Sequence, residues 1–101
     1  MVKWADYCIS HVRYNSPKTH IEIVKLRQDL GDSLGVPSTW ERTDVLDTLR
    51  NKESFCTIIE GTNNKWNQGA KVEIFTISGT DYIKTVKDST EKDNLGELPT
   101  F

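Results

Sequence analysis

The sequence has no long apolar run, no cluster of basic residues and only two cysteines, and each shortage excludes a class of protein. No stretch reaches the roughly 20 apolar residues of a membrane-spanning helix, and the opening MVKWADYCIS lacks the apolar core of a secretory signal. We therefore expect no membrane partner and a cytoplasmic location. The formal net charge is −2, with 13 basic and 15 acidic side chains spread along the chain, so we also expect no nucleic-acid partner.

Motifs for catalysis and cofactor binding are equally scarce. There is no glycine-rich phosphate loop and no serine or cysteine nucleophile motif, so we expect no cofactor and assign no catalytic residue. Cys8 and His11 lie three residues apart in a predicted strand, which places them on opposite faces, and no fourth ligand has zinc-site spacing. We therefore expect no metal. Cys8 and Cys56 are predicted to be buried, reduced thiols, although their even number leaves a disulfide open.

What the sequence does contain is a regular alternation of apolar segments and turns. Two strands rich in aromatic and β-branched residues predict a hairpin, and each changes the face that carries its apolar residues, which indicates β-bulges. Ser38 and Glu41 have capping-box spacing ahead of a short helix with an apolar stripe at Val45, Leu46 and Leu49. The predicted elements are strands at 5–15, 20–29, 54–60, 71–77 and 80–86, a helix after residue 40, a hairpin turn at 16–19, and loops at 30–40 and 61–70.

The order ββ-α-βββ predicts an α+β fold, a mostly antiparallel sheet of about five strands with one helix packed on one face. Ser78-Gly79 is predicted to be a two-residue hairpin turn that pairs Ile74 with Ile83 on one face and Phe75 with Tyr82 on the other. We expect residues 1–101 to form a single domain. Residues 87–101 are predicted to be a tail docked on the sheet, which covers Phe75 with Leu95, Leu98 and Phe101.

Trp66 is the strongest candidate for a binding residue. It lies in the polar stretch NNKWNQG, where strand periodicity does not account for a large aromatic ring. The ring either folds back onto the sheet or forms a stacking platform for a ligand. Trp40, in contrast, is predicted to plug the entry to the helix. The candidate ligand-binding residues are Lys65, Trp66, Tyr82, Lys84, Asp93 and Asn94.

Three functional hypotheses follow from these residues. The first is a non-catalytic binding module whose ligand is a small polar molecule, a peptide or another protein. The second is a small hydrolase or transferase that uses His11, His20 or Cys8. The third is a homodimer formed through an uncovered edge strand.

The segments WADYCISHVRYN, WERTDV and DYIKTVKDSTEKDNLGELP resemble a family of short bacterial and archaeal proteins described only as a domain of unknown function. The resemblance covers nearly the whole chain and is most specific at the ending, where it is carried by Tyr82, Ile83, Thr85, Asp93, Asn94, Leu95, Leu98 and Pro99. Lys84 stands where the family usually has arginine, which would weaken a bidentate contact, and residues 86–88 replace a short Asp/Gly turn. The resemblance implies a self-contained domain with an integral tail, and it implies no activity.

Overall fold

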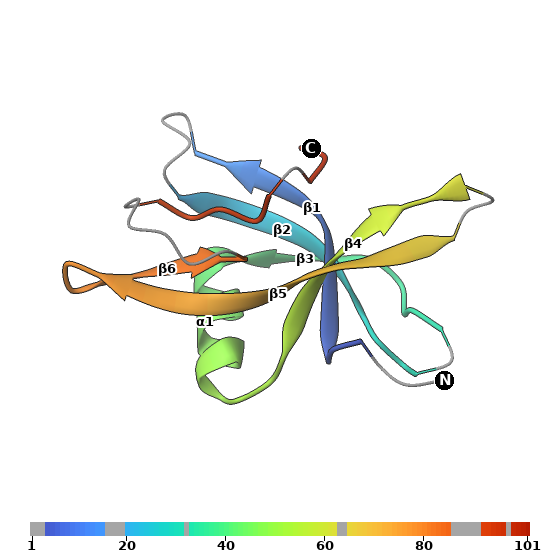
Figure 1. The fold of residues 1–101 in the computed structure, drawn as a ribbon, viewed down its shortest axis with the longest axis horizontal. Coiled ribbons are helices and arrows are strands. Elements are labelled where there is room, and N and C mark those ends of the chain that lie inside the picture. Colours follow the sequence, from blue (N-terminus) through green and yellow to red (C-terminus); the bar gives the residue numbers. More distant parts are fainter. Residues whose placement is uncertain (1–3, 16–19, 32, 63–64, 86–91, 97) are drawn as a thin grey trace.

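The computed structural model describes residues 4–15, 20–31, 33–62, 65–85, 92–96 and 98–101. Within these residues six strands form one sheet, and one helix packs beside it (Figure 1). The elements are β1 (Tyr7–Tyr14), β2 (Ile21–Gln28), β3 (Ser38–Glu41), α1 (Arg42–Arg50), β4 (Phe55–Glu60), β5 (Trp66–Ile77) and β6 (Thr80–Lys84). The α+β class is confirmed, with six strands rather than five. No helix in the described part of the chain is long and apolar enough to cross a membrane.

The additional strand, β3, lies inside the predicted loop 30–40. It pairs antiparallel with β2 and places Trp40 opposite Val24. A four-residue strand that follows Gly35 and Pro37 has too few alternating positions to stand out from a loop.

The start of α1 differs from the prediction. Because Ser38 belongs to β3, the predicted capping box of Ser38 and Glu41 is wrong. Glu41 is itself the N-cap residue, and its backbone N–H donates to the Asp44 carboxylate at 3.0 Å. The capping box is therefore shifted by three residues, from 38/41 to 41/44.

The sheet consists of two antiparallel halves. Its strand order is β3-β2-β1-β4-β5-β6, and α1 connects β3 of the first half to β4 of the second. Among the described strands, the parallel β1–β4 pair alone joins the halves within the sheet, through the residue pairs Tyr7–Phe55, Cys8–Cys56 and Ile9–Thr57. Beyond this junction the strands separate, as Figure 1 shows for β1 and β4.

The predicted bulges and hairpin register are confirmed. The β1–β2 pairing skips Ser10 on β1 and Glu22 on β2, which shifts the alternation by one residue, so that Ile9 and Val12 lie on the same face of the sheet. In the β5–β6 hairpin Ile74 pairs with Ile83 and Phe75 pairs with Tyr82. Both turn residues, 78 and 79, have positive φ angles (52° and 80°), which match the twist of the strands. The predicted turn at 16–19 lies outside the described residues.

Two buried clusters lie on the two faces of the sheet. The main cluster lies on the face covered by α1 and contains Ile9, Val12, Ile21, Val24, Leu26, Val45, Leu46, Phe55, Val72, Ile83, Leu95 and Leu98. The second cluster contains Ala5, Cys8, Cys56 and Ile58, with Trp4, Leu34 and Trp66 packed against it. Neighbouring strand residues alternate between the faces, so Cys8 enters the second cluster while Ile9 enters the main one.

The C-terminal segment closes the open side between the two halves of the sheet (red in Figure 1). Asn94 forms a parallel bridge with Lys84 of β6, and Thr100 forms one with Val12 of β1. The predicted cover for Phe75 is wrong, because Leu95 and Leu98 pack with Ile83 in the main cluster, on the opposite face of β5–β6. Residues 86–91 and 97 of the segment lie outside the described residues.

Candidate functional site

The six predicted ligand-binding residues do not lie together. Trp66 begins β5 opposite Glu60, so it is a strand residue and the predicted loop 61–70 is wrong from this position. Tyr82 pairs with Phe75, nine residues further along β5. At about 3.3 Å per residue, Trp66 and Tyr82 are separated by roughly 30 Å along the strand. Lys65 lies with Trp66, whereas Lys84, Asp93 and Asn94 lie with Tyr82.

Trp66 is half-buried against the second cluster. The Arg27 guanidinium lies over its ring, with Cζ 5.6 Å from the ring centroid. This geometry corresponds to the alternative in which the ring folds back onto the sheet.

Asp93 is a buried connector rather than a surface residue. Its carboxylate has no solvent exposure and accepts the backbone N–H groups of Ile21 and Ile83, each at 2.8 Å. Arg42 of α1 donates to both carboxylate oxygens, from Nε at 2.7 Å and from Nη2 at 3.2 Å, and donates to the Asp81 carbonyl at 2.6 Å. One carboxylate therefore ties β2, β6 and α1 to the C-terminal segment.

The remaining predicted residues near Asp93 are also engaged in the fold. Lys84 has 0% exposure and Tyr82 has 7%, and the Lys84 Nζ lies 5.9 Å from the Tyr82 ring centroid. The Asn94 side chain accepts the Gly96 N–H at 2.9 Å, which closes a turn at a glycine with φ of 80°. Tyr82, Lys84 and Asp93 therefore expose little of their side chains to a ligand.

The residues of the enzyme hypothesis lie in separate surroundings. Cys8 is fully buried in the second cluster, and its hydrogen bond with Cys56, followed by burial, raises the pKa of the Cys8 thiol. His11 accepts or donates a 2.8 Å hydrogen bond with Ser10 and packs edge-on against Phe101. Cys8 and His11 are therefore engaged with different partners, Cys56 and Ser10 respectively.

A different hollow lies beside the edge strand β3, on the face that carries the main cluster. We call it the Trp40 pocket and define it by its lining residues, which are Tyr7, Leu26, Gln28, Leu30, Gly35, Val36, Ser38 and Trp40. Its volume is about 370 Å³, enough for one or two side chains of a partner.

The wall of the Trp40 pocket is aromatic and held in place. The Tyr7 and Trp40 rings are 4.8 Å apart between centroids, and Phe55 stacks on Tyr7 at 5.2 Å. Aromatic pairs at this spacing contribute roughly 0.5–1.5 kcal/mol beyond their area burial. Because Phe55 is fully buried, the two outer rings rest on the core and form a preformed apolar wall.

The mouth of the pocket carries exposed apolar side chains. Val36 is 81% exposed and Leu30 is 57% exposed, whereas Leu34 of the same loop packs against the second cluster. The loop is held by the Gly35 N–H, which donates to the Gln28 carbonyl at 2.8 Å, and by Arg27, which donates to the Gly35 carbonyl at 3.0 Å. An apolar rim around a mostly apolar pocket makes this hollow a candidate interaction surface.

The outer edge of β3 adjoins the same pocket. β3 stands at the end of the strand order, so no other strand in the described part of the chain pairs with its outer side. Trp40 also lines a second hollow, together with Asp44, Asp47 and Thr48 of α1. Trp40 therefore borders both a mostly apolar pocket and an acidic one.

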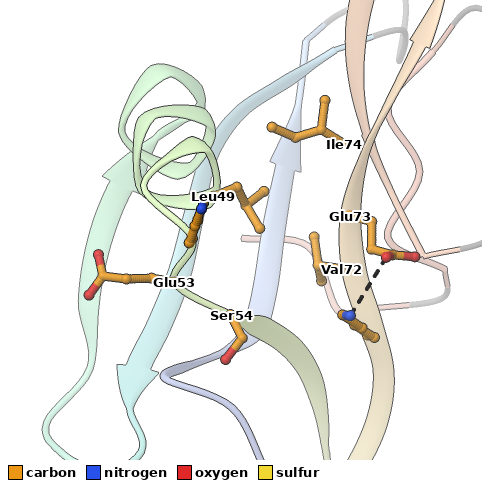
Figure 2. Close-up of a pocket in the computed structure, with 8 residues that line it drawn as sticks. Leu49, Glu53, Ser54, Val72, Glu73 and Ile74 are labelled. Carbon is orange, nitrogen blue, oxygen red and sulfur yellow. Dashed lines mark ion pairs between the residues drawn. The ribbon is translucent and has the colours of Figure 1, made fainter.

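A third hollow lies between α1 and β5. Figure 2 shows Leu49 facing Val72 and Ile74 across this space, whose volume is about 280 Å³. Its charged rim includes Lys71, whose ammonium lies 3.7 Å from the Glu73 carboxylate. β5 lies inside the sheet, so this hollow adjoins no strand edge, and its opposite charges offset one another.

The residues of the Trp40 pocket come from separate segments, and sequence patterns did not identify them as a site. Trp40 was predicted as a plug at the helix entry, and its contact with the core agrees with part of that role. The available signal was the pair of large apolar residues, Leu30 and Val36, in a loop that needs neither for turn formation.

A family model described as "Protein of unknown function (DUF3892)" matches residues 8–99. The chain belongs to the DUF3892 family. This finding confirms the resemblance read from the sequence, and the DUF3892 description assigns no activity. Comparison with curated proteins finds no match, and neither does comparison with solved structures.

Proposed function

We propose that this DUF3892 protein is a non-catalytic binding module that adds an extended peptide to the outer edge of β3. One apolar side chain of the peptide enters the Trp40 pocket. The observation that carries this proposal is the position of a preformed aromatic pocket directly beside an edge strand. In strand addition, main-chain hydrogen bonds supply affinity, and pockets for alternate side chains supply specificity.

The second hollow that Trp40 lines defines the second requirement on the peptide. Asp44 and Asp47 line it, so a lysine or arginine is the complementary side chain there. Side chains two residues apart on an extended peptide point to the same face and are separated by about 7 Å. The proposed ligand therefore carries an apolar residue and a basic residue at positions i and i+2.

The expected affinity is modest. Burial of one aliphatic side chain contributes about 1.5–3 kcal/mol, and each backbone hydrogen bond contributes about 0.5–1.5 kcal/mol. Association of the two molecules costs at least about 4 kcal/mol. A four-residue edge strand turns two residues outward, which allows about four such bonds, so we expect a Kd of about 0.2 mM to several millimolar, which NMR titration can measure.

The test uses the full ¹⁵N-labelled chain and the blocked pentapeptide acetyl-Thr-Leu-Thr-Lys-Thr-amide. We expect the amides of Ser38–Glu41 and the Trp40 indole N–H to shift, and the shifts to vanish when serine replaces the peptide leucine. Val36→Asp should weaken binding at least tenfold, because it places a charge at the apolar mouth. Ile59→Asp is the matched control, since Ile59 is 52% exposed on β4 and outside the pocket.

Two outcomes would overturn the peptide assignment. One is an absence of β3 shifts at several millimolar peptide, or shifts that survive Val36→Asp. The other is a doubled mass by light scattering, with β3 shifts that depend on protein concentration, because a second copy of the chain would then occupy the edge.

Three further points belong to the proposal. A cytoplasmic location is supported by the two free cysteines, since the cytosol keeps thiols reduced, and a bacterial or archaeal source rests on the resemblance. A single domain over residues 1–101, with 87–101 as its docked tail, is supported by the burial of Leu95 and Leu98 in the main cluster.

A further inference from the structure

Cys8 and Cys56 face each other at the junction of the two sheet halves. They are the middle residue pair of the parallel β1–β4 pairing. Their sulfur atoms lie 3.6 Å apart, and the two residues are 0% and 3% exposed. The pair therefore lies in direct contact at the backbone connection between β1 and β4.

The covalent geometry of a disulfide fits this position. Neighbouring strands are about 4.8 Å apart, which lies inside the range of roughly 4.4–6.8 Å between the Cα atoms of disulfide-bonded cysteines. The sulfurs must approach from 3.6 Å to about 2.05 Å, which side-chain rotation can supply without separating the strands.

A buried carboxylate completes the cluster. Asp29 is 4% exposed, and its Oδ2 atom lies 4.0 Å from the Cys8 sulfur and accepts the Trp4 N–H at 2.8 Å. The hydrogen bond to Cys8 lowers the pKa of Cys56, whereas the same contact raises the pKa of Cys8. The Asp29 carboxylate contacts the Cys8 sulfur and so disfavours a negative charge on Cys8 more than on Cys56, which makes Cys56 the thiol that loses its proton first. No group of three or more His, Cys, Asp or Glu side chains in the described part of the chain could hold a metal ion.

We propose that Cys8 and Cys56 form a site of reversible oxidation, in which hydrogen peroxide converts the two thiols to an intramolecular disulfide. The Cys56 thiolate attacks one peroxide oxygen, the O–O bond breaks, and the departing hydroxide takes up a proton to become water. The Cys8 sulfur then attacks the Cys56 sulfenic acid, the S–O bond breaks, and the second water leaves with the Cys8 proton. The thiols lose two electrons and two protons, and a dithiol reductant restores them.

The disulfide has a structural consequence at the junction. The β1–β4 pairing includes only three residue pairs, and the bond would lock the middle one. Tyr7, which lines the Trp40 pocket, is next to Cys8 in β1 and opposite Phe55 in β4. Oxidation is thus expected to slow amide exchange at Tyr7–Ile9 and Phe55–Thr57. This inference does not depend on the proposed function.

The test treats the folded full chain with hydrogen peroxide, denatures it, labels free thiols with iodoacetamide and measures intact mass. We expect loss of two hydrogens and of both labels, with both labels regained after dithiothreitol. The Cys8→Ser variant should instead accumulate a sulfenic acid on Cys56 that dimedone traps, while Cys56→Ser reacts at least tenfold more slowly. Circular dichroism verifies that the variants fold.

Three results would overturn the proposal. The first is that both thiols in the wild-type chain remain labelled after native treatment. The second is that the oxidised product is a dimer linked between chains. The third is an oxidation rate that rises with urea in proportion to the globally unfolded fraction, since oxidation would then require unfolding rather than the native pair.

Discussion

Replacing Asp93 with alanine should be among the most destabilising single substitutions in this protein. The change removes a fully buried carboxylate that accepts the backbone N–H groups of Ile21 and Ile83 and two donors of Arg42. Those donors belong to β2, β6 and α1. Loss of their shared acceptor, the Asp93 carboxylate, disconnects the C-terminal segment from these three elements at one point.

The magnitude follows from the groups left behind. A buried N–H without an acceptor costs about 1–3 kcal/mol, and a buried ion pair broken on one side costs about 3–5 kcal/mol. The Arg42 side chain is 22% exposed, so water can solvate part of its charge. We therefore expect the free energy of unfolding to fall by about 3–5 kcal/mol, a large part of the roughly 5–15 kcal/mol typical of a domain.

Urea denaturation followed by circular dichroism measures this loss. Asp47→Ala is the matched control, because Asp47 is 78% exposed and its contact with Arg50 is 3.7 Å long. Such an exposed helix pair contributes about 0.2–0.5 kcal/mol. A loss below about 1 kcal/mol for Asp93→Ala would refute the reasoning, because two buried N–H groups cannot lose their acceptor so cheaply. A double-mutant cycle with Arg42→Ala isolates the ion-pair contribution.

Two other predictions concern the second half of the sheet. Hydrogen bonds from Thr76 and Arg50 lower the pKa of Asp81 below its usual 3.8, so its stabilising effect is present above about pH 4 and is lost as pH falls through the lowered folded-state value. Acid unfolding curves of wild type and Asp81→Asn should therefore converge as the pH falls below about 4, and parallel curves would contradict this assignment. In β5, Gly69→Ala would place a Cβ atom 2.9 Å from the Thr57 carbonyl oxygen and in overlap with its hydroxyl. We expect a loss of about 1–3 kcal/mol in urea denaturation, and an unchanged midpoint would show that β4 can move away.

Local patterns in the sequence determine much of the fold. The two-residue turn at 78–79 and the alternation around it were sufficient for the β5–β6 register. The apolar stripe of α1 likewise identified Val45 and Leu46, which are both buried. These features depend on neighbours within a few positions, so a single sequence contains the information they need.

Long-range contacts explain what the sequence did not reveal. β3 forms a strand because β2 offers it a partner, although its own residues resemble a loop. Asp93 was predicted to bind a ligand, whereas in the fold it accepts hydrogen bonds from donors that lie 10 to 72 positions away. Those donors could not be identified from the residues next to Asp93. The Trp40 pocket likewise combines residues from β1, β2, the following loop and β3. No local spacing brings such segments together.

Intermolecular nuclear Overhauser effects between the blocked leucine–lysine pentapeptide and the full chain test peptide addition at β3 most directly. We expect contacts between the peptide backbone and residues 38–41, together with contacts from the leucine methyl groups to the Trp40 ring. Contacts confined to the Trp66 end of β5, or to the C-terminal segment, would contradict the assignment and move the binding site to those surfaces.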